Sequence, residues 1–298
     1  MFWPGYQEIP EPKSLDSTRM RLRALLSLVS KSLTMTKDVR SKILDTRKLR
    51  NSRINDVLLI GNGPSAGGLT FANVARFQAL GGSVAIMNSF YRSPLSRQVT
   101  PDYFFIGGPE FWKPIFKNNE NLRKEVENYI RNFAPNVTIV QPASVPPLLP
   151  EHSKYIFLDP RSAQGLWRSA RPDKPWGLPS SIAMVAIATL KFLGHRNILF
   201  TGLDSNLASF YYVGQLNNIL NFEKGQHFYS DSDSDSDLLE LLADETSENS
   251  RTSPFKNMAD ISYAQAVFLR DLYWLCSENC INVGNDKTND AAPRACIL

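Results

Sequence analysis

Only a few side chains in this sequence combine acid–base chemistry with a suitable setting. His227 lies in a long polar segment, and a histidine, with its pKa of about 6.5, is the usual group that removes a proton from a hydroxyl. Asp204 directly follows an apolar segment and is the second candidate base. His227 is equally explained as a solvated loop histidine, and Asp204 as a cap for backbone N–H groups. His152, in a proline-rich link, is expected to be incidental, and His195, in a helix-to-strand turn, to be solvated.

A second group of residues offers hydrogen-bond donors where predicted strands and helices end or begin. Residues 57–65 read V-L-L-I-G-N-G-P-S, an apolar run of strand length that breaks into turn residues. Asn and Gly tolerate positive φ, Pro fixes φ and Ser is a good N-cap, so the strand should end sharply and expose backbone donors. Anionic and nucleotide ligands bind at such strand ends in open α/β sheets, although an ordinary strand-to-helix turn explains this stretch equally well. The candidate binding residues are Asn62, Gly63, Pro64, Ser65, Asn88, Gly108, Ser180 and Ser181.

Several familiar catalytic motifs are absent from the sequence. It contains no Walker A loop, no G-x-S-x-G nucleophile elbow and no His/Glu metal motif. The turn G-N-G-P-S lacks the third glycine of the dinucleotide fingerprint, so a dinucleotide is a weak candidate ligand. Amide, hydroxyl and helix-end donors suit the phosphate, ribose and base of a nucleotide. They also suit a transfer reaction in which a nucleotide phosphate leaves.

The pattern of apolar segments predicts the elements that would position these residues. Short apolar runs alternate with amphipathic helical segments, which is typical of an α/β fold with a Rossmann-like, mostly parallel sheet and helices on both faces. The segment after Ser181 is apolar on nearly every side and should form a buried helix whose N-terminus could hold a phosphate or carboxylate. The predicted strands are 57–60, 83–87, 102–106, 137–140, 155–158, 197–201 and 280–283, and the further helices are 71–80, 119–133 and 261–275.

The chain divides by charge into a helical N-terminal extension, residues 1–54, and a catalytic domain, residues 55–298. The extension has 12 Lys and Arg against 5 Asp and Glu, whereas the complete chain has a net charge of only +4. Residues 205–254 form a long acidic, lid-like insertion with an alternating Ser/Asp run. We expect Asp16 to cap a first helix with an apolar stripe at Leu22, Leu25, Leu26, Val29 and Leu33.

Two interpretations of that stripe stay open. The helix either packs on the catalytic body or on a partner subunit, which would make the protein an oligomer, or contacts an anionic membrane surface. Nucleic-acid binding is not favoured, because aromatic residues are not interleaved with the basic ones. Residues 160–176, with four basic side chains and two tryptophans, are expected to form a mobile or ligand-facing loop.

The bulk composition fits one large cytoplasmic domain. The chain has 298 residues, of which 43% are hydrophobic and 21% charged, enough for a sizeable core. It has no run of about 18 apolar residues, and its first residues do not form a signal peptide. We therefore expect a cytoplasmic location, with peripheral contact at the inner face of the membrane through the basic segment. The cysteines at 276, 280 and 296 are expected to be buried or free thiols, and no metal site or cofactor is predicted.

An ordered set of segments resembles the bacterial family-42 sialyltransferases and the related motility-associated-factor and pterin-pyrophosphokinase-like proteins of polysaccharide gene clusters. It consists of I-G-N-G-P-S at 60–65, M-N-S-F-Y at 87–91, G-L-P-S-S-I-A-M-V-A-I-A from 177, and L-G-H-R-N-I-L-F-T-G-L-D at 193–204. The segment Q-H-F-Y-S-D around His227 is similar to a motif of the polysaccharide-cluster relatives. Together these segments span residues 56–285.

The resemblance implies a metal-independent, inverting glycosyltransferase. It would transfer a nonulosonic, sialic-acid-like sugar from a CMP donor to a glycan or glycolipid hydroxyl, without a cofactor. The turn at 62–65 would hold the nucleotide, Asn88 the nucleotide or sugar, and Ser180 and Ser181 the carboxylate or phosphate. Tyr211 and Tyr212 follow the strand-end Asp204, and Tyr212 matches the second of two phosphate-binding tyrosines, while Asn206 stands where the first would be.

Two departures from this family weaken the assignment of the donor. The sialyltransferases have a catalytic histidine shortly before the last helix, where residues 253–256 read S-P-F-K, and an arginine where Gly177 stands. His227 would then supply the base from the insertion. Two other functions stay open: an Mg-ATP-dependent pyrophosphokinase acting on pterin-like alcohols, and a nucleotide-sugar-binding protein without catalysis.

Overall fold

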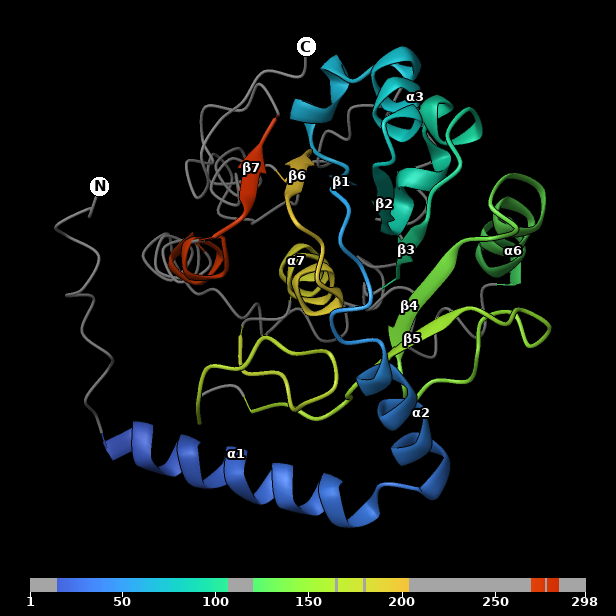
Figure 1. The fold of residues 1–298 in the computed structure, drawn as a ribbon. Helices are drawn as coiled ribbons and strands as arrows, with labels where there is room; N and C mark the ends of the chain where they lie inside the picture. Colours follow the sequence, from blue (N-terminus) through green and yellow to red (C-terminus); the bar gives the residue numbers. More distant parts are fainter. Residues whose placement is uncertain are drawn as a thin grey trace, which may run out of the picture.

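The computed structural model describes residues 15–106, 120–163, 166–178, 181–203, 269–276 and 278–283. The acidic insertion predicted at 205–254 lies outside these residues. Within them, seven strands form one all-parallel sheet in the order β5-β4-β3-β2-β1-β6-β7, which confirms the α/β, Rossmann-like prediction (Figure 1). The strands are β1 (Val57–Ile60), β2 (Ser83–Met87), β3 (Tyr103–Phe105), β4 (Thr138–Pro142), β5 (Tyr155–Leu158), β6 (Ile198–Thr201) and β7 (Cys280–Asn282).

Helices cover both faces of this sheet, because alternate strand residues point to opposite sides. On one side, Val57 and Leu59 belong to a core that includes α7 (Ile182–Leu193) and the helical segment 269–275. On the other, Leu58 and Ile60 pack with α3 (Phe71–Ala79) and α6 (Glu120–Phe133). This two-sided burial explains why most strand positions are apolar.

The helix α7 is the central helix of the fold. It contacts β1, β2 and β6, and nine of its residues are buried, which confirms that it is apolar on nearly every side. It ends at Gly194, whose φ of 92° is in the left-handed region. A Cβ there would also lie 2.8 Å from the Arg53 carbonyl oxygen, so glycine is required both by the backbone angle and by the close packing.

Short 3-10 helices follow β1 and β2 before the chain enters longer helices. They are η1 (Pro64–Gly68), η2 (Asn88–Arg92) and η3 (Pro94–Arg97). Ser65 therefore lies inside η1 and caps no helix, contrary to its expected role. The cap of α3 is Thr70, whose hydroxyl accepts a hydrogen bond from the Asn73 N–H in a capping box.

The helix α2 (Lys37–Lys48) packs against β5, the edge strand of the sheet. The Thr46 hydroxyl donates to the Phe157 carbonyl oxygen and accepts from the Phe157 N–H, both at 2.9 Å. It thereby satisfies backbone groups that an edge strand would otherwise leave unpaired. The later part of the basic extension, residues 37–48, is thus a helix that covers the edge of the sheet. The division at residue 54 stays a prediction.

The helix α1 (Leu15–Thr34) contacts the body through one side only. Asp16 lies inside this helix and not at its cap. The apolar stripe expected to pack on the body is exposed at Leu22, Leu26 and Leu33, whereas Leu28 on another side is buried. The helix does pack on the body, but through Leu28 and Ser32, which lie beside the stripe, and not through the stripe itself. Contact of α1 with a partner subunit or a membrane stays a prediction.

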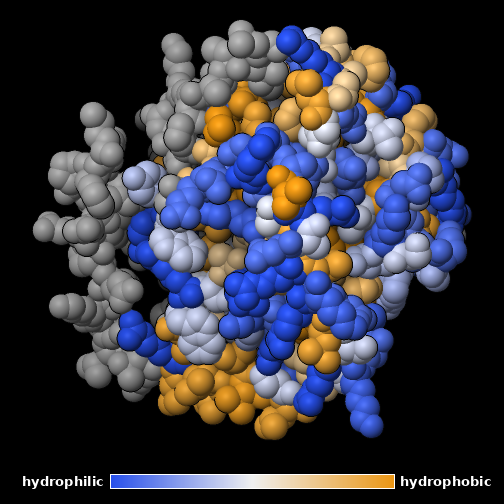
Figure 2. Space-filling model, viewed as in Figure 1, coloured by the Kyte–Doolittle hydropathy of each residue, from blue (hydrophilic) through white to orange (hydrophobic). Residues whose placement is uncertain are grey.

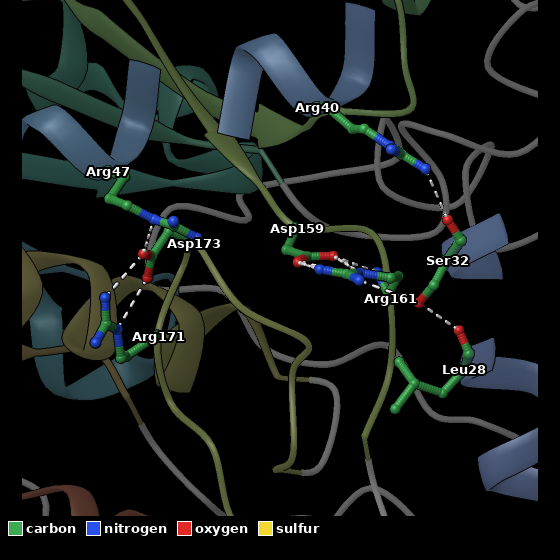
Figure 3. A network of polar contacts seen from close by, with 8 residues as sticks. All are labelled: Leu28, Ser32, Arg40, Arg47, Asp159, Arg161, Arg171 and Asp173. Atoms are coloured by element: carbon green, nitrogen blue, oxygen red, sulfur yellow. Dashed lines mark hydrogen bonds and ion pairs between the residues drawn. The ribbon is translucent and has the colours of Figure 1, made fainter. Parts of the chain in front are cut away.

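The described part of the loop at 160–178 is held by ion pairs to buried carboxylates (Figure 3). Arg161 binds the Asp159 carboxylate through two nitrogens, and Arg171 does the same with Asp173. The carboxylates of both Asp159 and Asp173 are fully buried. Since these guanidinium groups are used internally, this part of the loop is not the mobile, ligand-facing segment that was expected.

Candidate functional site

The strand order changes direction at β1, which defines the switch point of the sheet. The chain passes from β1 outward through β2 to β5 on one side, then crosses by α7 to β6 on the other. Ile60 is paired in register with Ile86 of β2 and Thr201 of β6, so β1 and β6 end level and β2 runs one residue further. In open parallel sheets, ligands bind in the crevice beyond the strand ends at this point.

Two glycine backbones meet directly beyond these strand ends. A Cβ on Gly61 would lie 2.2 Å from the Gly202 carbonyl oxygen, and one on Gly202 would lie 2.6 Å from the Gly61 carbonyl oxygen. Gly202 also has a φ of 70°. Only glycine at both positions lets β1 and β6 approach this closely.

The turn after β1 is fastened to the end of β6 by three hydrogen bonds. The Gly63 N–H donates to the Gly202 carbonyl oxygen at 2.9 Å, and the Gly202 N–H donates to the Ser65 hydroxyl at 2.8 Å. The Thr201 hydroxyl donates to the Ser65 carbonyl oxygen at 3.0 Å. Gly63 and Ser65 therefore fix the shape of the turn, and the Gly63 N–H is used within the protein. Asn62, which directly precedes Gly63 in this turn, is half-buried. The fixed shape of the turn determines where its side chain lies.

Asn88 lies at the end of the neighbouring strand, where β2 passes into η2. Its φ of 40° is in the left-handed region, which asparagine tolerates better than most residues. The pairing of Ile60 with Ile86 places Asn88 level with Asn62 of the turn after β1. The sheet therefore brings these two predicted binding residues to adjacent strand ends.

Ser181 reaches the same edge from the helix layer. It is the N-cap of α7, yet its side chain makes no capping hydrogen bond. The other end of α7 packs near Asn51 and Arg53, before β1 begins, so α7 runs antiparallel to the strands. Its N-terminus, with the positive end of the helix dipole, is thus at the carboxyl edge. Turn, strand end and helix end therefore lie at the same edge of the sheet, and their joint role in binding stays a prediction.

The remaining predicted site residues lie outside the described residues. These are His227, Asp204, Gly108, Ser180, Tyr211 and Tyr212, and of Pro64 only the backbone is described. Their catalytic and binding roles stay predictions. In the described ranges, no group of three or more His, Cys, Asp or Glu side chains is arranged to hold a metal ion.

The rings of the other two histidines, His195 and His152, make hydrogen bonds within the fold. The His195 ring is buried, with Nδ1 3.1 Å from the Asn55 carbonyl oxygen and Nε2 3.2 Å from the Tyr103 hydroxyl. This corrects the expectation of a solvated side chain. His152 is anchored too, since its Nε2 lies 2.6 Å from the Val137 carbonyl oxygen. The amino-edge position of His195 also separates it from the candidate site.

Burial lowers the pKa of His195 to about 4, and the nearby Arg53 adds to this effect, while the Asn55 carbonyl and Asp56 oppose it. Between about pH 6.5 and 4 the unfolded chain binds a proton that the folded chain does not, so stability falls as the pH falls. From pH 7.5 to 5.5 we expect this group to reduce the free energy of unfolding by about 1 kcal/mol. Urea unfolding across this range measures it.

The matched variant for this pH dependence is His195→Gln. It should be less stable than the wild type at pH 7.5, but with a shallower decline toward pH 5.5. Equal slopes for the two proteins would show that His195 does not take up a proton on unfolding in this range.

A cavity of about 630 Å³ lies away from the candidate site and was not expected from the sequence. It lies between the α1–α2 junction and the residues that follow β4 and β5, with Lys31, Lys42 and Arg161 in its lining. Two of these cations are already neutralised, Lys42 by Asp38 at 2.6 Å and Arg161 by Asp159 at 2.6 Å. In the sequence, only the basic residues of the N-terminal extension and of the loop at 160–178 pointed to it. Their composition does not reveal that these two segments meet.

The geometry defines a parallel α/β protein whose strand order reverses at β1. No protein-family model, curated protein or solved structure matches this chain. No helix in the described ranges has the length and apolar character needed to span a membrane.

Proposed function

We propose that this protein is a glycosyltransferase that binds a nucleotide-activated sugar, a CMP-nonulosonate, at the carboxyl edge beside β1. The observation that supports this proposal most is the meeting of three elements at the switch point. The turn after β1, Asn88 after β2 and the N-terminus of α7 all reach this edge. Neutral amide and hydroxyl groups with a helix dipole suit a nucleotide monophosphate whose charge is low.

In the proposed reaction, an acceptor hydroxyl on a glycan or glycolipid displaces CMP from the anomeric carbon, with inversion. His227 takes the proton of the hydroxyl as the new glycosidic bond forms. The bond between the anomeric carbon and the phosphate oxygen breaks, and its electrons leave with CMP. Ser181, with the end of α7, stabilises the departing phosphate. Asp204 is the alternative base.

Binding of CMP in the presence of EDTA tests the first step of this proposal. We expect Asn88→Gly to weaken CMP binding roughly three- to tenfold, the effect of one lost hydrogen bond. Glycine keeps the positive φ of this position, so the variant should remain as stable as the wild type. Isothermal titration calorimetry on the complete chain measures the affinity.

The control is Asn279→Gly, the same substitution at an exposed asparagine with a φ of 60° beside the start of β7. It should leave CMP affinity unchanged. Equal affinities for all three proteins would place the nucleotide elsewhere, and a folded wild type that does not bind CMP would remove the proposal.

The same titrations separate the two alternative functions. A pyrophosphokinase would bind ATP with Mg²⁺ and not CMP. A binding protein without catalysis would bind the CMP-sugar yet neither hydrolyse nor transfer it. His227→Ala should abolish transfer and leave CMP binding intact if His227 is the base.

A further inference from the structure

The helix α1 is held on the body at Ser32 by two arginines (Figure 3). The Arg161 guanidinium donates to the Ser32 hydroxyl at 3.1 Å, and Arg40 donates to the Ser32 carbonyl oxygen at 3.2 Å. Leu28, one turn earlier, is buried. The helix thus has a fixed orientation, and the side that points away from Leu28 faces outward.

That outward side is apolar along its described length. Its side chains recur at the spacing of one helical face, and most are half-exposed or more, with Leu33 at 77%, Leu26 at 60% and Leu22 at 56%. Figure 2 shows hydrophobic side chains gathered at the lower edge of the molecule, where α1 lies in Figure 1. A continuous apolar face of this kind marks an interaction site. The residues that form it, called the α1 stripe below, are Leu22, Leu25, Leu26, Val29 and Leu33.

Positive charge borders the α1 stripe on the side that faces away from the body. At 100° per residue, the exposed Arg23 falls beside Leu26, whereas Arg21, also exposed, falls on the side of the buried Leu28. No acidic residue occurs between Asp16 and Asp38. An apolar face with a cationic border matches an anionic lipid surface, in which acyl chains receive the leucines and headgroups receive the arginine.

We propose that α1 lies in the plane of an anionic lipid bilayer with the α1 stripe inserted among the lipids. A second copy of this chain is the competing occupant, since residues 22, 26, 29 and 33 also have the spacing of a helix pair. Charge favours the lipid, because α1 of a second copy has no acidic residue between Asp16 and Asp38 that could neutralise Arg23, whereas anionic headgroups do so. Docking leaves the candidate nucleotide site open, because the turn after β1 lies at the other end of the molecule (Figure 1).

Sedimentation of the complete chain with vesicles tests this inference. We expect binding to phosphatidylcholine vesicles that contain about one third phosphatidylglycerol, and at least tenfold weaker binding to phosphatidylcholine alone. The double variant Leu26→Ser with Leu33→Ser should lose at least tenfold in binding. Arg23→Gln should lose about fivefold, and salt should weaken the wild type.

The matched control removes two exposed apolar side chains away from α1, with Ile54→Ser and Leu80→Ser, at 86% and 81% exposure. It should bind vesicles as the wild type does. Equal binding of the wild type and the Leu26/Leu33 variant would overturn the proposal, as would equal binding to neutral and anionic vesicles. So would a wild-type dimer, seen by light scattering, that the Leu26/Leu33 variant abolishes while neither protein binds vesicles.

Discussion

Replacing Gly61 by alanine is expected to lower the free energy of unfolding by roughly 3 kcal/mol or more. The new Cβ would lie 2.2 Å from the Gly202 carbonyl oxygen and 2.7 Å from its carbonyl carbon. Both are backbone atoms that cannot move independently of β6. The Gly61 N–H also donates to the Thr201 carbonyl oxygen at 2.8 Å, so β1 and β6 would have to separate. These are neighbouring strands within the seven-stranded sheet. Urea unfolding, followed by circular dichroism, measures the loss.

The control is Gly81→Ala, in the turn before β2. Gly81 has a positive φ, of 85°, which Gly61 does not, but a Cβ there would meet nothing within 4 Å. Its cost should therefore be limited to backbone strain of roughly 1–2 kcal/mol. If Gly61→Ala were no less stable than Gly81→Ala, the close approach of β1 and β6 at the candidate site would be wrong.

The second large effect is expected at Asp173, the buried carboxylate that joins α2 to the loop at 160–178. Asp173 accepts from Arg171 at 2.9 and 2.8 Å and from Arg47 at 3.1 Å (Figure 3). Burial alone would raise the pKa of this carboxyl, but the two guanidinium groups outweigh it and lower the pKa. Asp173→Asn should cost roughly 2–3 kcal/mol, because two cations lose their counter-charge beside a buried site. This is below the largest effects of broken buried pairs, since Arg47 is half-exposed.

Asp45→Asn is the matched control on α2. Asp45 pairs with Lys48 at 2.8 Å, but both side chains are well exposed, so its loss should cost less than about 0.5 kcal/mol. Denaturation midpoints of the two variants, measured at pH 7, give the comparison. Similar midpoints would mean that Asp173 is not the buried anchor of α2.

The sequence determined the strands and helices of the body with few errors. The expected strands at 57–60, 83–87 and 155–158 agree with β1, β2 and β5 at both ends. The reason is local, since continuous apolar runs bounded by turn residues suit strands buried on both faces. The apolar character of α7 likewise predicted its central position.

Part of the candidate site also followed from the sequence. Asn62, Asn88 and Ser181 were predicted at strand and helix ends, and the parallel topology brings such ends to one edge. The predicted chemistry, which depends on His227 and Asp204, lies outside the described residues. The sequence could not show that the Gly63 N–H and Ser65 hydroxyl bond to Gly202, because these partners are more than 130 residues apart in the chain.

Tertiary structure alone decided the environment of the charged and amphipathic residues. His195 is buried because β3 brings the Tyr103 hydroxyl beside a turn that looks solvent-exposed in the sequence. Arg161 and Arg171 are neutralised because each forms an ion pair with a buried carboxylate. The periodicity of α1 predicted an apolar stripe, but whether a helix face meets core or solvent depends on which other segments cover it. Here Arg161 and Arg40 hold Ser32, beside the stripe, and the leucines that point away from the body are exposed.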